Sequence, residues 1–233
     1  MIKLQKLDEP EVLARNGERW KQALLEVLGR GEDPTDYLAS RYRHQDIKDR
    51  LLEETRGKCA YCDGKVAHVA YPHVEHIIPK SRRPDLHFTW ANLTLACPVC
   101  NVNKGIAFDE QAADARLIDP YNDDPSEHFI FYGDLIIPLP ANDRAFITIS
   151  KLKLSRDELI ERRRDRLNYV MALIDLYARS REDMKQLFFD DLMENHVTVF
   201  TEFYQTTVSL VKALVANGVI SREHAARFPE LID

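Results

Sequence analysis

Two neighbouring stretches decide the fold: PHVEHIIPK over residues 72–80 and WANLTLACPVCNVNK over residues 90–104. Between residues 58 and 105 the helical spacing of apolar residues disappears, and turn residues and histidines replace it. Four of the eight histidines fall in this segment. The segment is therefore expected to form a unit of its own, and it holds most of the residues that are suited to chemistry.

The four cysteines of the chain form two C-x-x-C pairs, Cys59 with Cys62 and Cys97 with Cys100. A single pair would also fit a redox motif, but two pairs that use every cysteine predict a tetrahedral zinc site. Four thiolates leave no open coordination position, so this zinc is expected to be structural. The alternative, four buried or reactive thiols, is left open by the spacing.

Composition excludes several classes of protein. The chain has 233 residues, of which 45% are hydrophobic and 30% charged, as is typical of globular proteins with one large or two small domains. No run of about 18 apolar residues indicates a membrane span, and the first residues lack the apolar core of a secretion signal, so we expect a cytoplasmic protein. A net charge of −6 excludes a wholly basic nucleic-acid binder.

The charge is unevenly distributed. Residues 56–104 contain seven lysines and arginines against three acidic residues. A basic patch in an acidic protein suggests a local site for a polyanion, although a solvated charged face would have the same composition.

The rest of the chain divides into three further segments. Residues 1–57 have the pattern of helices. Asp8 is expected to cap the first helix and Gly29 to end it, and Asn16–Gly17 is a weak point within it. Residues 106–154 predict a hairpin around Gly133–Asp134 and a further strand over 145–149. Residues 155–233 return to helix. They start at a capping box formed by Ser155 and Glu158 and continue through a second long helix over 181–216 that ends at Asn217–Gly218.

The arrangement of polar residues in the two opening stretches resembles that of the HNH endonucleases. The matching residues are Glu75 and His76, Asn92, Asn101 and Lys104, and the cysteine pairs bracket them. The resemblance implies an α+β fold: a ββα-metal nuclease lobe over residues 58–105 with a four-cysteine zinc knuckle, flanked by N-terminal helices and a C-terminal helical region. Glu replaces the frequent Asp, and Asn replaces the frequent His at the third position. The expected metal affinity is therefore modest.

The resemblance also implies roles for these residues. Glu75 and Asn101 supply hard oxygen ligands for catalytic Mg²⁺ or Mn²⁺, and His76 is the general base, with its tautomer fixed by a backbone carbonyl. Asn92 positions the loop or His76 itself. Asn103 competes with Asn101 as the ligand, and His73 is an extra ligand, a substrate contact or a structural residue.

Basic side chains near the motif are expected to contact the nucleic-acid backbone, namely Lys80, Arg82, Arg83 and Lys104. The arginine-rich run Arg162–Arg166 is a further candidate. The simpler interpretation is a solvated helix face on which these arginines pair with Glu158 and Glu161.

Softer motifs outside the lobe resemble the PtuB-type nucleases, the HNH subunits of the Septu anti-phage system, which also occur beside some retrons. They include LIDPY over residues 117–121, Asp124–Pro125 and LKL over residues 152–154. This resemblance implies DNA as the substrate and a PtuA-like ABC/SMC-type ATPase as the partner, docked on the flanking helices. Two alternatives remain: a zinc-stabilised nucleic-acid-binding module that does not cut, and a scaffold subunit with a vestigial nuclease site.

Overall fold

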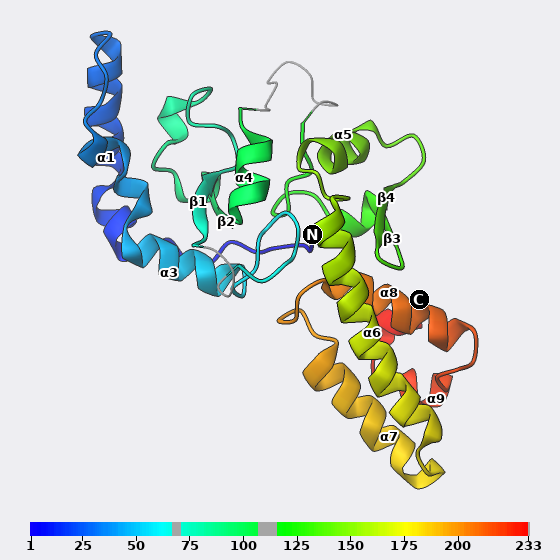
Figure 1. The fold of residues 1–233 in the computed structure, drawn as a ribbon. Helices are drawn as coiled ribbons and strands as arrows, with labels where there is room; N and C mark the ends of the chain where they lie inside the picture. The colour runs from blue at the N-terminus through cyan, green and yellow to red at the C-terminus, as the bar shows by residue number, and fades with distance from the viewer. Residues whose placement is uncertain (67–70, 107–115, 233) are drawn as a thin grey trace.

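The computed structural model describes residues 1–66, 71–106 and 116–232 (Figure 1). Its helices are α1 (Glu11–Gly29), α2 (Asp36–Ala39), α3 (Gln45–Glu54), α4 (Pro98–Lys104), α5 (Asp143–Lys151), α6 (Asp157–Arg179), α7 (Glu182–Asp191), α8 (Tyr204–Ala216) and α9 (Arg222–Ala225). Its strands are β1 (His73–His76), β2 (Leu93–Ala96), β3 (Phe129–Tyr132) and β4 (Leu135–Pro138). The expected α+β fold is confirmed.

Strands β1 and β2 pair antiparallel and lead into α4, which is the ββα arrangement that the resemblance implied. The register sets Glu75 opposite Thr94 and His76 opposite Leu93. Cys97 precedes α4, and its sulfur accepts a hydrogen bond from the Cys100 amide at 3.4 Å. The same residue thus starts the helix and belongs to the cysteine cluster.

Helix α1 differs from the expectation at its start and in its middle. It begins after Pro10, without a side-chain cap from Asp8, and continues through Asn16–Gly17 to Gly29. Gly17 is buried, and a β-carbon there would meet the Phe88 carbonyl oxygen at 3.4 Å and Leu13 at 3.3 Å. The glycine therefore lets α1 approach the segment that contains Phe88 closely.

The hairpin β3–β4 has its turn at Gly133–Asp134, as expected, and Gly133 has a φ of 58°. The strand expected over residues 145–149 is wrong, because this segment is helix α5. The Asn142 side chain caps its first turn by accepting from the Ala145 amide at 3.0 Å. Ala145 and Thr148 lie on the buried face, so capping and burial outweigh the β-propensity of the sequence.

Two expectations for the C-terminal region are also wrong. Helix α6 begins after Arg156 with no side-chain cap, so Ser155 and Glu158 do not form a capping box. The helix expected over 181–216 is two helices, α7 and α8, separated by a π-helical turn and an irregular segment. Phe203, the residue just before α8, has a left-handed φ of 56°, and its side chain is buried in the same hydrophobic cluster as Cys59 and Leu95. The expected end at Asn217–Gly218 is confirmed.

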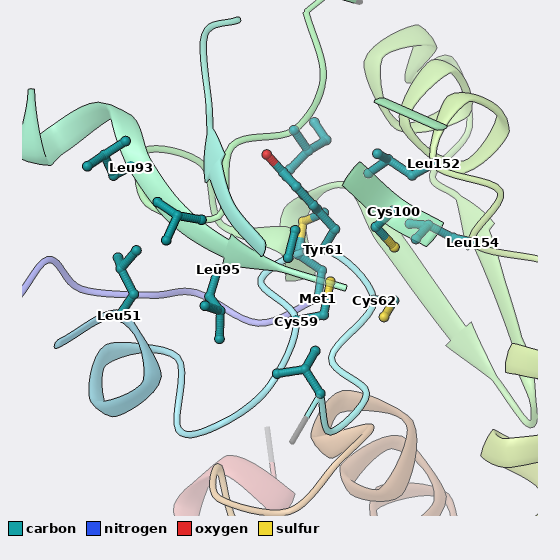
Figure 2. Close-up of a cluster of buried hydrophobic side chains, with 14 of the residues drawn as sticks. Met1, Leu51, Cys59, Tyr61, Cys62, Leu93, Leu95, Cys100, Leu152 and Leu154 are labelled. Atoms are coloured by element: carbon teal, nitrogen blue, oxygen red, sulfur yellow. The ribbon is translucent and has the colours of Figure 1, made fainter. Parts of the chain in front are cut away.

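The residues that the structure describes form two main hydrophobic cores. The larger one joins the N-terminal helices, the ββα unit, the hairpin and α5, and Figure 2 shows Leu51 of α3 beside Leu93 and Leu95 of β2. The smaller core lies among α6, α7, α8 and α9. Helix α6 contributes Leu159 to the first core and Val170 and Ile174 to the second. Within the described residues, no helix has both the length and the apolar character needed to cross a bilayer.

Candidate active site and four-cysteine cluster

A cavity of about 610 Å³ lies beside β1. Glu75, His76 and Asn101 all line it, and so do His73 and Lys80. The carboxylate, the imidazole and the amide singled out from the sequence are therefore brought to one place. This happens because β1 ends at His76 while α4 carries Asn101 back alongside the strand.

The imidazole of His76 is held by a contact with the loop that follows β1. Its Nε2 lies 2.9 Å from the backbone oxygen of His87, and a carbonyl oxygen can only accept, so Nε2 carries the proton. Nδ1 is then the nitrogen with a free lone pair. Burial lowers the pKa of His76 to about 3, so the ring is neutral at physiological pH. A backbone carbonyl thus fixes the tautomer, as expected.

Glu75 is buried beside the ammonium of Lys104, whose Nζ lies 2.7 Å from Glu75 Oε1. Lys104 also donates to the His76 carbonyl oxygen at 2.8 Å. Burial raises the pKa of Glu75, and the charge of Lys104 opposes that rise. Lys104 is itself buried. The sequence predicts that Lys104 contacts nucleic acid; in the structure its side chain turns inward and donates to a carboxylate and a backbone oxygen.

The two candidate asparagines of α4 lie in different surroundings. Asn101 contacts His73 of β1, with 2.9 Å between Asn101 Nδ2 and His73 Nδ1. Asn103 donates to the Val99 carbonyl at 2.8 Å and lines a separate cavity next to Cys62 and Cys97. Residues two apart on a helix point to different sides, so only Asn101 of these two lines the cavity that holds Glu75.

Asn92 is buried and ties together the loop that follows β1. Its Oδ1 accepts from the Ile78 amide at 2.8 Å, and its Nδ2 donates to the carbonyl oxygens of Ile78 and Leu86 at 3.0 and 3.3 Å. The loop held in this way includes His87, the residue that accepts from His76. Asn92 therefore acts on the loop rather than within the cavity.

The other basic side chains near the motif differ in their surroundings. Lys80 is exposed and lines the cavity. Arg82 is exposed, and Arg83 makes a two-pronged contact with Asp85 at 2.8 and 2.6 Å. Among these residues, Lys80 is the one placed beside Glu75 and His76.

The four cysteines converge: one sulfur from each lies within 4.8 Å of the other three. Cys62 and Cys97, from the two different pairs, have their sulfurs 4.0 Å apart. Four thiolates around zinc lie roughly 3.8 Å apart when each Zn–S bond is about 2.3 Å. The cluster is therefore suited to a tetrahedral zinc ion. It links the loop before β1 to the start of α4.

A buried ion pair, missed from the sequence, fastens this cluster to the C-terminal region. Lys58 Nζ lies 2.7 Å from Asp63 Oδ1, and both side chains are almost fully buried. Lys58 also donates to the Thr201 carbonyl at 3.0 Å, and Asp63 Oδ2 accepts from the Tyr204 amide at 2.8 Å. The segment before α8 is thus packed directly on the first cysteine pair. The sequence gives no signal of this contact, because the two side chains bind backbone groups of a segment that is distant in the chain.

The arginine run on α6 serves the same junction. Arg162 pairs with Glu202 at 3.0 Å, and the buried Arg163 donates to the Leu154 carbonyl at 2.9 Å. Arg164 pairs with Asp134 at 2.8 Å. The expected partners Glu158 and Glu161 are therefore wrong for these arginines, because α6 lies against the hairpin and the 198–203 segment instead of presenting a free face.

Comparison with known proteins agrees with this geometry. Residues 59–106 match the HNH endonuclease family. A Septu protein PtuB of Bacillus thuringiensis is 37% identical over 88 residues, which is 37% of this chain and 33% of that protein. A Septu protein PtuB of Bacillus mycoides (strain KBAB4) is 26% identical over 194 residues, covering 70% of this chain and 66% of that protein. Both alignments thus span less than two thirds of the relatives' own lengths.

The family match covers both cysteine pairs, β1, β2 and α4, which are the elements that build the cavity and the cluster. The similarity to the second relative extends well beyond this unit. Residues 59–106 of this chain are therefore similar to an HNH endonuclease domain, and the chain is similar to PtuB over most of its length.

Proposed function

We propose that the chain is a metal-dependent endonuclease that hydrolyses phosphodiester bonds of DNA, as the nuclease subunit of an anti-phage defence complex. One observation carries the catalytic part of this proposal: Glu75, His76 and Asn101 line a single cavity within the HNH domain. A buried neutral imidazole beside a carboxylate and an amide can supply the general base and the oxygen ligands for metal-assisted hydrolysis.

His76 acts as the general base in this proposal. Its proton on Nε2 is engaged by the His87 carbonyl, so Nδ1 accepts the proton of the attacking water. The low pKa keeps the ring able to accept across the physiological range. A phosphate anion entering the cavity raises that pKa, because a negative charge favours imidazolium. Asn92 is a positioning residue, since it holds the loop that carries His87.

Glu75 and Asn101 would hold the catalytic ion, which we propose to be Mg²⁺ or Mn²⁺, because their oxygens are hard donors on one cavity wall. The bound ion would supply Lewis-acid stabilisation of the charge that develops on the phosphate. His73 contacts Asn101 and orients its amide. The Lys104 ammonium opposes the rise in the pKa of Glu75 that burial causes, and so favours the carboxylate form that binds a cation.

The cysteine cluster would hold zinc in a structural role. Its four sulfurs leave no ligand position for water, so it contributes geometry rather than chemistry. The partner we propose is a PtuA-like ATPase, on the basis of the similarity to PtuB. The exposed faces of the C-terminal helices would form the docking surface.

The test is cleavage of supercoiled plasmid by the purified chain with Mg²⁺ or Mn²⁺, alone and with the ATPase partner. We expect nicking or linearisation that a chelator stops and that His76→Ala lowers at least 100-fold. His44→Asn is the matched control, because His44 is exposed and an asparagine can replace its helix-capping contact to the Asp46 amide. DNA binding without cutting in every state would contradict the proposal and favour a binding module.

A further inference from the structure

One side of the active-site cavity comes from outside the HNH domain. Tyr42 and Arg43, at the turn before α3, line the cavity together with Lys48 of α3. All three precede Cys59, where the family match begins. Tyr42 is buried, Lys48 is half-buried and Arg43 is exposed. The N-terminal segment therefore forms part of the cavity wall as well as part of the hydrophobic core.

Tyr42 gathers positive charge at this wall. Its hydroxyl lies 3.0 Å from Arg43 Nε and 3.5 Å from Lys80 Nζ. The Lys80 ammonium also lies over the Tyr42 ring, 5.1 Å from its centroid. Cations from two distant parts of the chain are thus held at the mouth of one cavity around a shared phenol.

These cations lack acidic partners among the residues that the structure describes. Across residues 1–66, 71–106 and 116–232, no ion pair with a carboxylate engages Arg43, Lys48 or Lys80. Glu75, the carboxylate of the cavity, is already neutralised by Lys104. The wall therefore presents a net positive charge that an anionic ligand would compensate.

We propose that Arg43 and Lys48, acting with Lys80, bind backbone phosphates that flank the scissile phosphate of DNA. This inference rests on the proposed function, whose substrate it positions. Lysine and arginine that are not neutralised internally bind phosphate by releasing condensed counterions from the nucleic acid. Because Tyr42 also packs against His76, the same wall would fix the position of the bound DNA strand relative to the general base.

The experiment measures DNA binding separately from cleavage. Every protein carries His76→Ala, and a fluorescent duplex of about 30 base pairs is titrated at salt concentrations from about 50 to 250 mM. Arg43→Ala with Lys48→Ala is expected to weaken binding and to make the negative slope of log K against log salt less steep by about two, since each phosphate contact contributes about −0.9 to the slope. Cleavage is not required for this readout.

The control pair is Lys151→Ala with Arg222→Ala, which removes two exposed basic residues at the end of α5 and the start of α9. This pair should leave the slope unchanged. An unchanged slope for the Arg43 and Lys48 pair, an equal fall in both pairs, or no binding by the parent overturns the inference. If melting shows that the alanine pair is unfolded, Arg43→Gln with Lys48→Gln replaces it. If the Arg43 and Lys48 pair changes the salt dependence of DNA binding as expected but the wild-type chain never cuts DNA, the proposed function is contradicted and the phosphate-binding inference is supported.

Discussion

Lys104 and Glu75 form a buried ion pair at the junction of α4 and β1, with 2.7 Å between Nζ and Oε1. The same ammonium donates to the His76 carbonyl, so one side chain connects the end of the helix to both residues of the Glu–His motif. In this way the last residue of α4 fixes the strand end on which the proposed chemistry depends.

Replacing Lys104 with methionine should destabilise the protein by about 3 kcal/mol, because it leaves the Glu75 carboxylate buried without its partner. Urea unfolding measures this loss. Adding Glu75→Gln should recover part of it, since no unpaired charge then remains. Equal stability of wild type and Lys104→Met would show that the pair contributes nothing.

Tyr42 should affect catalysis through its contact with His76. The two rings meet edge to face with centroids 4.6 Å apart, a contact worth about 1 kcal/mol beyond simple burial. We expect Tyr42→Leu to lower kcat for plasmid cleavage about fivefold, while Tyr42→Phe keeps kcat within about twofold because the ring remains. Equal losses in both variants would mean that the hydroxyl, and not the ring, matters.

His87 makes stability depend on pH. Burial lowers its pKa to about 4, and its Nε2 lies 3.0 Å from the Ala39 carbonyl oxygen. In the unfolded chain a histidine has a pKa near 6.5. The unfolded state therefore takes up a proton first as pH falls, so the stability that is complete above about pH 6.5 is lost progressively towards pH 4.

The loss attributable to His87 should be about 1 kcal/mol per pH unit over this window. Urea unfolding at pH 7.5, 6.5, 5.5 and 4.5 measures it. His87→Gln should show a shallower dependence than wild type, because the amide does not titrate. Parallel curves for the two proteins would rule out this histidine as a source of the effect.

Removing a cysteine should unfold the nuclease lobe. Cys59→Ser or Cys97→Ser takes one ligand from the cluster, and structural zinc contributes folding free energy directly. We expect about one zinc per chain in the wild type by elemental analysis, and a lower melting temperature in both variants and after chelation. A zinc-free wild type with an unchanged melting curve would contradict this prediction.

The sequence predicted the features that depend on residue type and spacing. The two C-x-x-C pairs converge, the Glu75–His76 dipeptide ends a strand, and Asn101 shares a cavity with it. These features depend on short sequence motifs, or on the residue pattern shared with the HNH family, and not on contacts between distant segments. The catalytic roles of these residues stay predictions until the variants are measured.

Features set by tertiary contacts were not predictable. Residues 145–149 have strand-like composition, yet a cap and a buried face make them helix α5. From the sequence, Lys104 is expected to contact nucleic acid. In the structure its ammonium binds the Glu75 carboxylate and the His76 carbonyl oxygen. Tyr42 lies far from the motif in sequence, and only the packing of the N-terminal segment brings it to His76.

Helix α6, which holds Leu159 in one core and Ile174 in the other, has a mechanical consequence. Its 23 residues form a rod of about 35 Å whose near end lies beside the cysteine cluster, where Arg156 lies 3.9 Å from the Cys100 sulfur. A partner protein that bound α7, α8 and α9 and tilted them would therefore also move the near end of α6. That movement would apply a torque to the four-cysteine cluster.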